Sequence, residues 1–241
     1  MGYKRLEFDS DAFGFPVAQV EPPSPLRPAV EALMNEMRSE GIRLAYVSAP
    51  SEDAVVCGFW SSLSGGTGYE RVVYNGSIPD DEPTTEEQRN GILDGLGRPF
   101  TEEWGRLSCQ SGLYSRFNRD PRIPKEVFKR IYHQWMINSL EGRVAEAVYA
   151  ASQGGVMTGM VTVGRRGDEG FIGLVAVDYQ SRRQGTGRLL MGEAFRWMRR
   201  QGCRRWRVVT QGENQPALLF YESFGARIVE RAMIYHLWLD E

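Results

Sequence analysis

A short basic segment rich in glycine has the residue types of an anion-binding turn. Residues 182–188 hold three arginines together with Gly185 and Gly187. An apolar run at 174–177 precedes the segment, and a helical pattern of apolar residues follows it at 189–198. A glycine turn at a helix N-terminus points backbone N–H groups at one anion, and the helix dipole favours negative charge there. The sequence therefore predicts a phosphorylated ligand at this turn.

Two common phosphate-binding motifs do not fit this segment. A Walker loop requires a Gly-Lys pair, which the chain lacks. A dinucleotide fingerprint requires a third glycine, where this chain has Leu190, and an acidic residue about 20 residues further on, where it has arginines at 205 and 207. The preceding strand is also predicted to come from an antiparallel meander. These departures argue against a Rossmann dinucleotide site.

A different pair of motifs fits. Residues 182–187 match the pattern Q/R-x-x-G-x-G/A, and residues 214–226 look like the element N-x-x-A-x-x-L-Y-x-x-x-G-F. Phe220 replaces the usual leucine before the tyrosine, and Ala226 replaces the usual phenylalanine after the glycine. Together the two motifs resemble the GNAT superfamily of acetyl-CoA-dependent N-acyltransferases. The resemblance covers roughly residues 105–239.

The resemblance implies a cofactor site and an acid. The backbone of residues 175–177 would pair with the pantetheine arm, Asn214 would hydrogen-bond it, and Tyr221 would protonate the leaving thiolate. A phenol suits that role because it stays protonated at neutral pH. The co-substrate implied is acetyl-CoA, with no metal. The residues expected to hold it are Val175, Ala176, Val177, Arg182, Arg183, Gln184, Gly185, Thr186, Gly187, Arg188, Asn214 and Ala217.

Structural roles remain open for some of these residues. Tyr221 has helical spacing with Ala217 and Phe224, so it could simply pack, and Asn214 could be only a helix N-cap. The general base is not identified, because residues 171–177 include no ionisable side chain. The two histidines, His133 and His236, lie in apolar stretches and are interpreted as structural.

Three looser matches concern the acceptor. Residues 8–15, 114–120 and 135–140 look like parts of a GNAT subgroup that acylates nucleotide-linked amino sugars, the dTDP-fucosamine (dTDP-4-amino-4,6-dideoxygalactose) acetyltransferases. The resemblance implies a sugar nucleotide used for surface polysaccharide. Guanidinium groups suit its diphosphate and aromatic faces suit its sugar or base. The residues expected to bind it are Tyr114, Arg116 and Trp135. Tyr114 and Trp135 could also be packing residues.

Two other functions remain open. A GNAT enzyme could acetylate a protein N-terminus, an antibiotic or another small amine. A non-catalytic domain could bind CoA as a sensor or scaffold. An acidic groove would favour the first of these alternatives, whereas a basic pocket would favour the sugar nucleotide.

The predicted fold is α/β (α+β), with a mixed, mostly antiparallel sheet flanked by helices. From residue 105 the expected order is β, α, α, β, β, β, α, β, α, β, beginning with a strand at 107–113 and helices across 125–140. Residues 1–104 are predicted to form a smaller α/β domain, with an acidic linker at about 76–104 and a turn at 9–11. Residues 105–241 are predicted to be the acyltransferase domain.

Composition limits the partners and the cellular compartment that we expect for this protein. The net charge of −2 argues against bulk binding to nucleic acid. Three distant cysteines argue against a disulfide scaffold or a structural zinc site. The chain shows neither a signal-peptide core nor an apolar run long enough to span a bilayer, so we expect a cytoplasmic protein without a membrane partner. The last predicted strand, at 227–239, is a candidate surface for homodimerisation.

Overall fold

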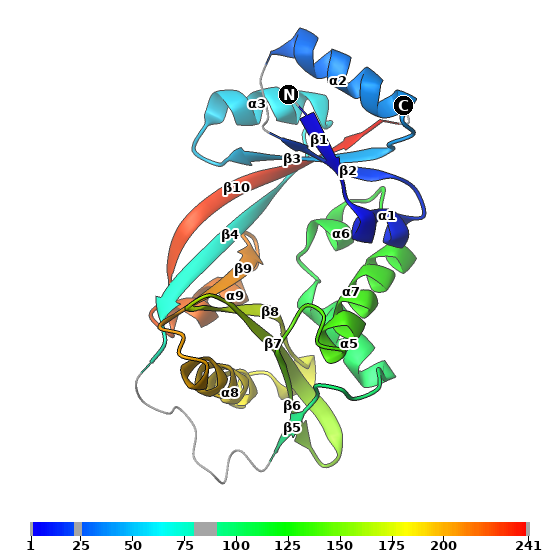
Figure 1. The fold of residues 1–241 in the computed structure, drawn as a ribbon. Helices are drawn as coiled ribbons and strands as arrows, with labels where there is room; N and C mark the ends of the chain where they lie inside the picture. The colour runs from blue at the N-terminus through cyan, green and yellow to red at the C-terminus, as the bar shows by residue number, and fades with distance from the viewer. Residues whose placement is uncertain (1, 22–25, 80–90, 240–241) are drawn as a thin grey trace. The chain divides into compact units, whose positions relative to one another are not determined.

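The computed structural model describes residues 2–21, 26–79 and 91–239, which divide into two compact units (Figure 1). The first unit holds residues 1–72, 211–213 and 230–241, and the second holds 73–210 and 214–229. Strands β4 (Gly68–Ser77) and β10 (Arg227–Trp238) contribute residues to both units. Most of the predicted linker at 76–104 therefore belongs to the second unit; its residues 80–90 lie outside the described part of the chain.

The first unit is a small α/β layer structure. Its strands are β1 (Gly2–Arg5), β2 (Val17–Glu21) and β3 (Leu44–Pro50), in the order β1-β2-β3-β10. β2 and β3 are parallel, whereas β1–β2 and β3–β10 are antiparallel. Its helices are α1 (Glu7–Phe13), α2 (Arg27–Ser39) and α3 (Ala54–Leu63). Trp60 and Met37 are fully buried in its core together with Val47.

The turn predicted at residues 9–11 is wrong, because these residues lie inside α1. Ser10 explains the difference: its hydroxyl donates to the Leu6 carbonyl oxygen and accepts from the Val17 amide. Gly14, with φ 76°, then ends the helix in the left-handed conformation that glycine adopts without a steric cost. Ser10 therefore ties this short helix to the start of β2.

The second unit contains a sheet with helices on both faces. Its strand order is β4-β9-β8-β7-β6-β5, with β8 and β9 parallel and the β5 to β8 pairs antiparallel. The strands introduced here are β5 (Ile92–Asp94), β6 (Ala147–Gln153), β7 (Val156–Arg166), β8 (Glu169–Val177) and β9 (Arg205–Gln211). The helices are α5 (Glu102–Ser111), α6 (Arg116–Arg119), α7 (Lys125–Leu140), α8 (Thr186–Arg200) and α9 (Gln215–Glu222), with a 3₁₀ turn η1 (Tyr179–Ser181).

The strand predicted at residues 107–113 is wrong, because α5 occupies this stretch. Trp104, Leu107 and Ser108 are buried at a spacing of three and four residues, which places them on one helix face. The strand was predicted from residues 107–113 alone, whereas the buried face of the helix begins earlier, at Trp104. A single helix, α7, spans residues 125–140, where two helices were predicted. The elements predicted after it, from β6 to β10, are confirmed in type and order.

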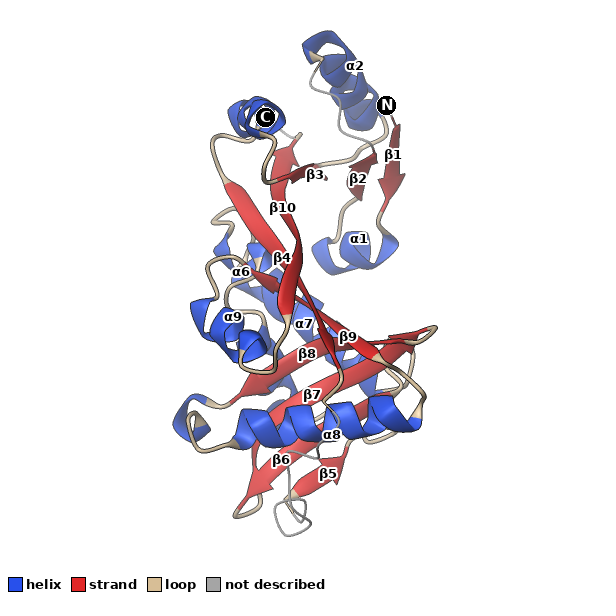
Figure 2. Cartoon of the chain, turned by 90° about the vertical axis from the view of Figure 1, so that its left-hand side faces the viewer, coloured by secondary structure: helices blue, strands red, loops and turns tan. Residues whose placement is uncertain are grey.

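The two faces of this sheet carry different helices. α8 covers one face, where a Cβ atom added at Gly170 would collide with Met198 of α8. α5 and α7 lie on the opposite face (Figures 1 and 2), where Trp104 of α5 packs near Val148 of β6. Ligands that reach β8 from the two faces therefore meet different helices.

A β-bulge changes which side of β8 faces α8. Val163 pairs with Ile172, but Val161 pairs with Val175, so β8 holds one extra residue in this interval. The Thr162 hydroxyl accepts a hydrogen bond from the Leu174 amide at 2.8 Å. The extra residue reverses the alternation, so side chains at 170 and 172 face α8 before the bulge, and those at 175 and 177 face it afterwards.

The parallel strands β8 and β9 part beyond the bulge. Their pairing runs from Glu169 with Arg205 to Ile172 with Val208, yet β8 continues to Val177 and β9 to Gln211. On its other side, β8 remains paired with β7 as far as Val177. The backbone of residues 174–177 therefore presents an edge toward the opening between the two strands.

Candidate active site

The loop after β8 is anchored by a carboxylate. Asp178 caps η1 by accepting from the Gln180 amide at 3.1 Å. Its other oxygen forms an ion pair with Arg106 and accepts from the Gln110 amide group at 3.1 Å. Arg106 also donates to the Met157 carbonyl oxygen at 3.0 Å. Two side chains of α5 thus fix the point where β8 turns into the loop.

The loop backbone is shaped to receive an anion. Arg183, with φ 61°, and Gly185, with φ 87°, both adopt the left-handed conformation, and Gly185 is the N-cap of α8. Among the described residues, Arg183 is the only non-glycine with positive φ. Left-handed residues in a turn direct successive N–H groups into one concavity, and the first turn of α8 adds N–H groups without intrahelical partners. The predicted phosphate cradle therefore has suitable backbone geometry.

The side chains of this loop are arranged for access. Arg182, Arg183, Gln184, Gly185 and Arg188 are exposed, whereas Thr186 and Gly187 are half-buried. A Cβ atom at Gly187 would lie 3.1 Å from the Phe220 ring and 3.5 Å from Val177. Glycine at this position lets the start of α8 approach both α9 and the end of β8. The three parts of the predicted cofactor site consequently meet here.

The β8 edge could pair with an extended ligand that carries amide groups, and one of its carbonyl oxygens, that of Val177, already accepts a hydrogen bond within the protein. Val175 and Val177 are half-buried and Ala176 is buried. The Arg182 side chain donates to the Val177 carbonyl oxygen at 3.1 Å, and its guanidinium lies 3.9 Å from the Tyr179 ring centroid. A ligand amide that pairs with this carbonyl shares it with Arg182 or displaces that side chain. The remaining edge of residues 174–176 faces the opening between β8 and β9.

Tyr221 is a buried phenol on the α8 side of the sheet. Its side chain is 3% exposed, and its ring lies 5.9 Å from Tyr74 and 6.1 Å from Trp206. Burial raises the pKa of Tyr221 well above the usual value for a phenol. Among the described residues, no side chain or backbone group hydrogen-bonds its hydroxyl. The proton is therefore retained at neutral pH and is free to be donated to a ligand.

Tyr74 was not predicted from the sequence, although it packs against Tyr221. It lies on β4, is fully buried, and donates a hydrogen bond to the Glu222 carboxylate at 2.7 Å. This bond joins β4 to α9 at the residue after Tyr221. It fixes the position of α9, so Tyr74 acts on Tyr221 through packing and through this helix.

Asn214 is the N-cap of α9. Its side-chain oxygen accepts from the Ala217 amide at 3.3 Å, and its amide group donates to the Thr210 hydroxyl at 3.3 Å. The structural role considered for Asn214 is thus confirmed. Ala217 is half-buried in the first turn of the same helix. Binding of pantetheine by these two residues stays a prediction.

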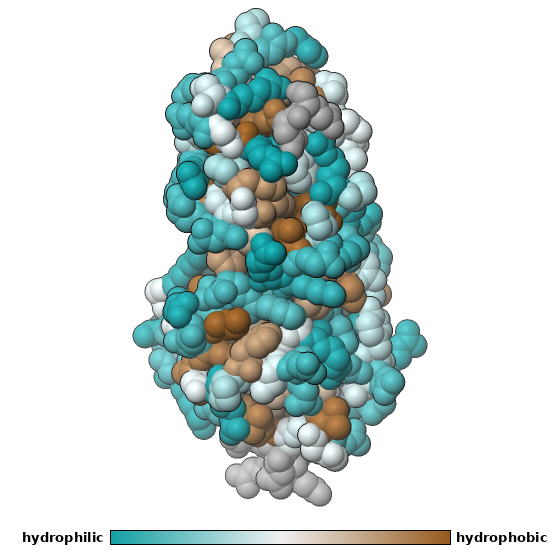
Figure 3. Space-filling model, turned by 90° about the vertical axis from the view of Figure 1, so that its right-hand side faces the viewer, coloured by the Kyte–Doolittle hydropathy of each residue, from teal (hydrophilic) through white to brown (hydrophobic). Residues whose placement is uncertain are grey.

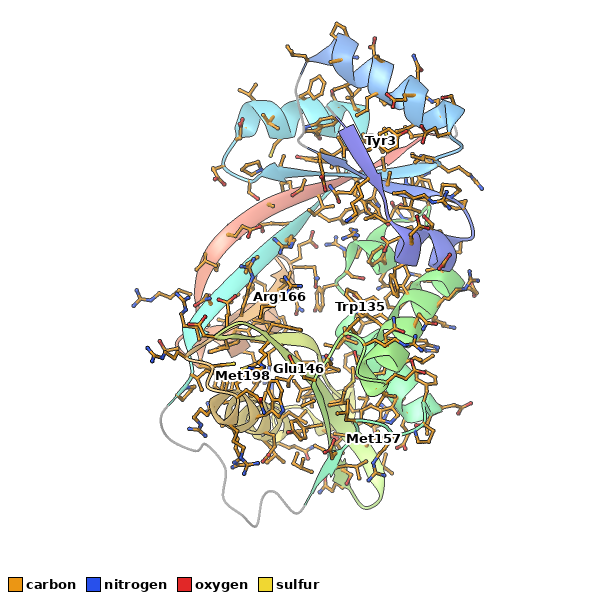
Figure 4. All side chains as sticks on the ribbon, viewed as in Figure 1. Tyr3, Trp135, Glu146, Met157, Arg166 and Met198 are labelled. Carbon is orange, nitrogen blue, oxygen red and sulfur yellow. The ribbon has the colours of Figure 1, made fainter. Side chains whose placement is uncertain are left out.

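The three predicted acceptor residues lie on the other helical layer. Tyr114 precedes α6 and Arg116 begins it. Trp135, labelled in Figure 4, lies on α7. Tyr114 and Trp135 are each 38% exposed, so neither is a core residue. The Arg116 guanidinium lies 4.2 Å from the Phe117 ring centroid. These residues approach the sheet from the face opposite the one that Tyr221 occupies.

Residues 171–177 of β8 offer no general base, because none of them has an ionisable side chain. Glu169 is the first residue of β8, before these positions, and its carboxylate accepts from the Asn75 amide group at 2.6 Å. His133 lies on α7, where burial lowers its pKa, and its ring is 5.3 Å from Phe100. His236 packs between Tyr46 and Tyr69 in the first unit. Both histidines pack against aromatic rings, as expected of structural residues.

No helix within residues 2–21, 26–79 and 91–239 has both the length and the apolar character needed to cross a membrane. On the side viewed in Figure 3, hydrophobic residues form small separate areas among hydrophilic ones. This face therefore presents no single broad apolar surface.

Comparison with known proteins gives a family match and a fold match. Residues 111–226 match the model of the acetyltransferase (GNAT) family. A spore coat polysaccharide biosynthesis protein, SpsD of Bacillus subtilis (strain 168), is 28% identical over 138 residues, which are 57% of this chain and 47% of that protein. The chain therefore spans about half the length of this curated relative.

Two solved structures illustrate the likeness in fold. A tandem GNAT protein from the clavulanic acid biosynthesis pathway aligns with a TM-score of 0.57 at 15% identity, over 95% of this chain and 77% of that one. A GCN5-related N-acetyltransferase from Sphaerobacter thermophilus aligns with a TM-score of 0.60 at 15% identity, over 98% and 76%. The likeness includes the first unit, and the chain has the GNAT fold.

Proposed function

Because residues 111–226 match the GNAT acetyltransferase family, we propose that this protein moves an acetyl group from acetyl-CoA to the amine of a nucleotide-linked amino sugar. The observation that carries the proposal is the unpaired edge of β8, which leads directly into the left-handed loop at the start of α8. An extended arm ending in a pyrophosphate matches an edge that ends in an anion cradle.

In the proposed reaction, each of these residues has a separate role. Backbone groups of Val175 and Val177 pair with the pantetheine amides, after Arg182 leaves the Val177 carbonyl. N–H groups of the loop and first turn of α8 hold the pyrophosphate, with Arg183 and Arg188 adding charge. The amine nitrogen attacks the thioester carbonyl, so a C–N bond forms and the C–S bond breaks. Tyr221 supplies its proton to the departing thiolate, and the nitrogen releases its proton to solvent.

The acceptor assignment has separate support. The similar protein SpsD is named as a spore coat polysaccharide biosynthesis protein. Residues 8–15, 114–120 and 135–140 resemble enzymes that acylate amino sugars on nucleotides. An amine on sugar carbon C4 is less basic than a lysine side chain, which suits the absence of an ionisable side chain at residues 171–177 of β8. We propose that Tyr114, Arg116 and Trp135 contact this acceptor.

The test is a turnover panel. Purified protein and acetyl-CoA are incubated with dTDP- and UDP-linked amino sugars, peptides, polyamines and aminoglycosides, and free thiol is followed. Thiol release confined to the sugar nucleotides is expected. Release with peptides or polyamines alone contradicts the acceptor assignment, and binding of CoA without any turnover favours a sensor.

Tyr221→Phe tests the acid. We expect kcat to fall by about 10²- to 10⁴-fold, the usual contribution of a positioned acid. The KM for acetyl-CoA should change little, because the ring and its packing remain. Turnover equal to that of the wild type would remove Tyr221 from the mechanism.

A further inference from the structure

Part of the sheet face opposite α8 carries an aromatic ring with one guanidinium group beside it and a second arginine on the neighbouring strand. Phe171 of β8 lies beside Gly164 of β7 and Arg207 of β9 in the strand register. A Cβ atom at Gly164 would collide with the Phe171 ring, so the ring lies across the bare backbone of β7. The Arg166 guanidinium is 5.6 Å from the centroid of this ring. We call Arg166, Phe171 and Arg207 the sheet platform.

The platform faces away from the α8 core. Gly170 and Ile172 are buried on the α8 side, whereas Phe171 is half-buried and Gly173 is exposed. In Figure 4, Met198 lies with α8 and Arg166 lies at the other side of the β7–β8 hairpin. A planar ligand can therefore lie over Phe171 without disturbing the packing of α8.

Charge on this face selects an anion. The paired positions of β7, β8 and β9 on it hold three arginines, at 166, 205 and 207, and one carboxylate, that of Glu169. The Glu169 carboxylate is hydrogen-bonded to Asn75 at 2.6 Å. Guanidinium groups bind phosphate oxygens in a bidentate manner, and aromatic rings stack on nucleobases. The combination matches a nucleoside diphosphate.

The spacing links the platform to the reaction. Val175, where the edge for pantetheine begins, lies four positions after Phe171 on β8, which is about 13 Å of strand. A sugar attached through a diphosphate to a nucleoside spans a gap of this kind, with its amine at one end and its base at the other. Gly173, which is exposed and has no side chain, lies between the two points.

We propose that the sheet platform binds the nucleoside diphosphate of the acceptor, with the base stacked on Phe171 and the diphosphate between Arg166 and Arg207. This inference rests on the proposed acetyl transfer to a nucleotide-linked amino sugar. It assigns the nucleotide end of that acceptor to the strands, whereas Tyr114, Arg116 and Trp135 belong to the helical layer.

The experiment compares one amino sugar with and without its nucleotide. We measure kcat/KM for dTDP-linked and free amino sugar in the wild type, Arg166→Gln, Arg207→Gln and Phe171→Leu. Each arginine variant should lower kcat/KM for the nucleotide-linked sugar by about 10- to 100-fold, the usual effect of losing a charge-assisted hydrogen bond. The free sugar and the KM for acetyl-CoA should be unaffected. Arg200→Gln, an equal charge change at the exposed last turn of α8, is the control.

Direct binding separates this inference from the proposed function. Calorimetric titration with dTDP and with UDP gives a Kd for the wild type and for each variant, whatever the acceptor. Weaker binding in the three platform variants and unchanged binding in Arg200→Gln supports the platform, even if no amino sugar is acetylated. Equal losses for free and nucleotide-linked sugar, or a nucleotide Kd that the variants leave unchanged, overturn it. Melting temperatures identify any variant that is unfolded, and Arg166→Lys then replaces it.

Discussion

The hydrogen bond between Thr162 and Leu174 should hold the bulge of β8, and Thr162→Val removes it with little change in shape. Thr162 is 1% exposed, and its hydroxyl accepts from the Leu174 amide at 2.8 Å. Leaving a buried N–H without an acceptor costs about 1–3 kcal/mol. For a chain of this size, each kcal/mol lowers Tm by about 2–4 °C, so a fall of roughly 2–12 °C is expected.

The same substitution should weaken acetyl-CoA binding, because the bulge decides which way residues 174–177 point. Calorimetric melting and the KM for acetyl-CoA are measured together. Thr158→Val is the matched control, because Thr158 lies on β7 like Thr162. Its hydroxyl donates to the carbonyl oxygen of Ala151, on β6, at 3.2 Å. The control should lose stability but keep its KM. A Thr162→Val protein with wild-type Tm and wild-type KM would refute this role for the bulge.

Two further predictions concern the loop and the buried phenol. Arg183→Ala should be less stable than Arg183→Gly by about 1 kcal/mol in urea unfolding, because only glycine adopts φ 61° without cost; equal stabilities would mean that this backbone is not strained. Both variants should raise the KM for acetyl-CoA alike. Burial raises the pKa of Tyr221, so the folded state keeps a proton that the unfolded state loses above about pH 10. Its contribution to the free energy of unfolding is therefore constant below pH 10 and falls as pH rises further, by up to about 1.4 kcal/mol per pH unit. Urea midpoints between pH 8 and 11 should decline less steeply in Tyr221→Phe, and parallel curves would contradict the shift.

Local patterns were enough to predict much of the site. The loop at 182–188 and the helix at 214–222 each carry their signals within a dozen residues, and both form the predicted elements. N-cap geometry at Asn214 likewise follows from residue type and position. Such features depend on neighbours in the chain, which a sequence displays directly.

Features that depend on strand register could not be predicted. The bulge requires that Thr162 lie opposite Leu174, and the platform requires that Phe171 lie beside Gly164 and Arg207. Neither relation is visible until β7, β8 and β9 are aligned. The contacts of Arg106 and Gln110 with Asp178 were missed for a related reason. On α5 the two residues are one helical turn apart, about 6 Å along the axis, and both reach one carboxylate. The strand predicted at 107–113 would separate residues four positions apart by about 13 Å.

The opening between β8 and β9 also exposes the protein to unwanted pairing. An unpaired strand edge can accept a strand from another molecule, and it is a common starting point for aggregation. The bulge bends the edge, and the Arg182 side chain covers the Val177 carbonyl while placing a positive charge beside it. In the protein without ligand, Arg182 thus protects this part of the β8 edge from pairing with a strand of another molecule. A bound pantetheine arm would take over the same protective role, so acetyl-CoA should keep the protein soluble on mild heating.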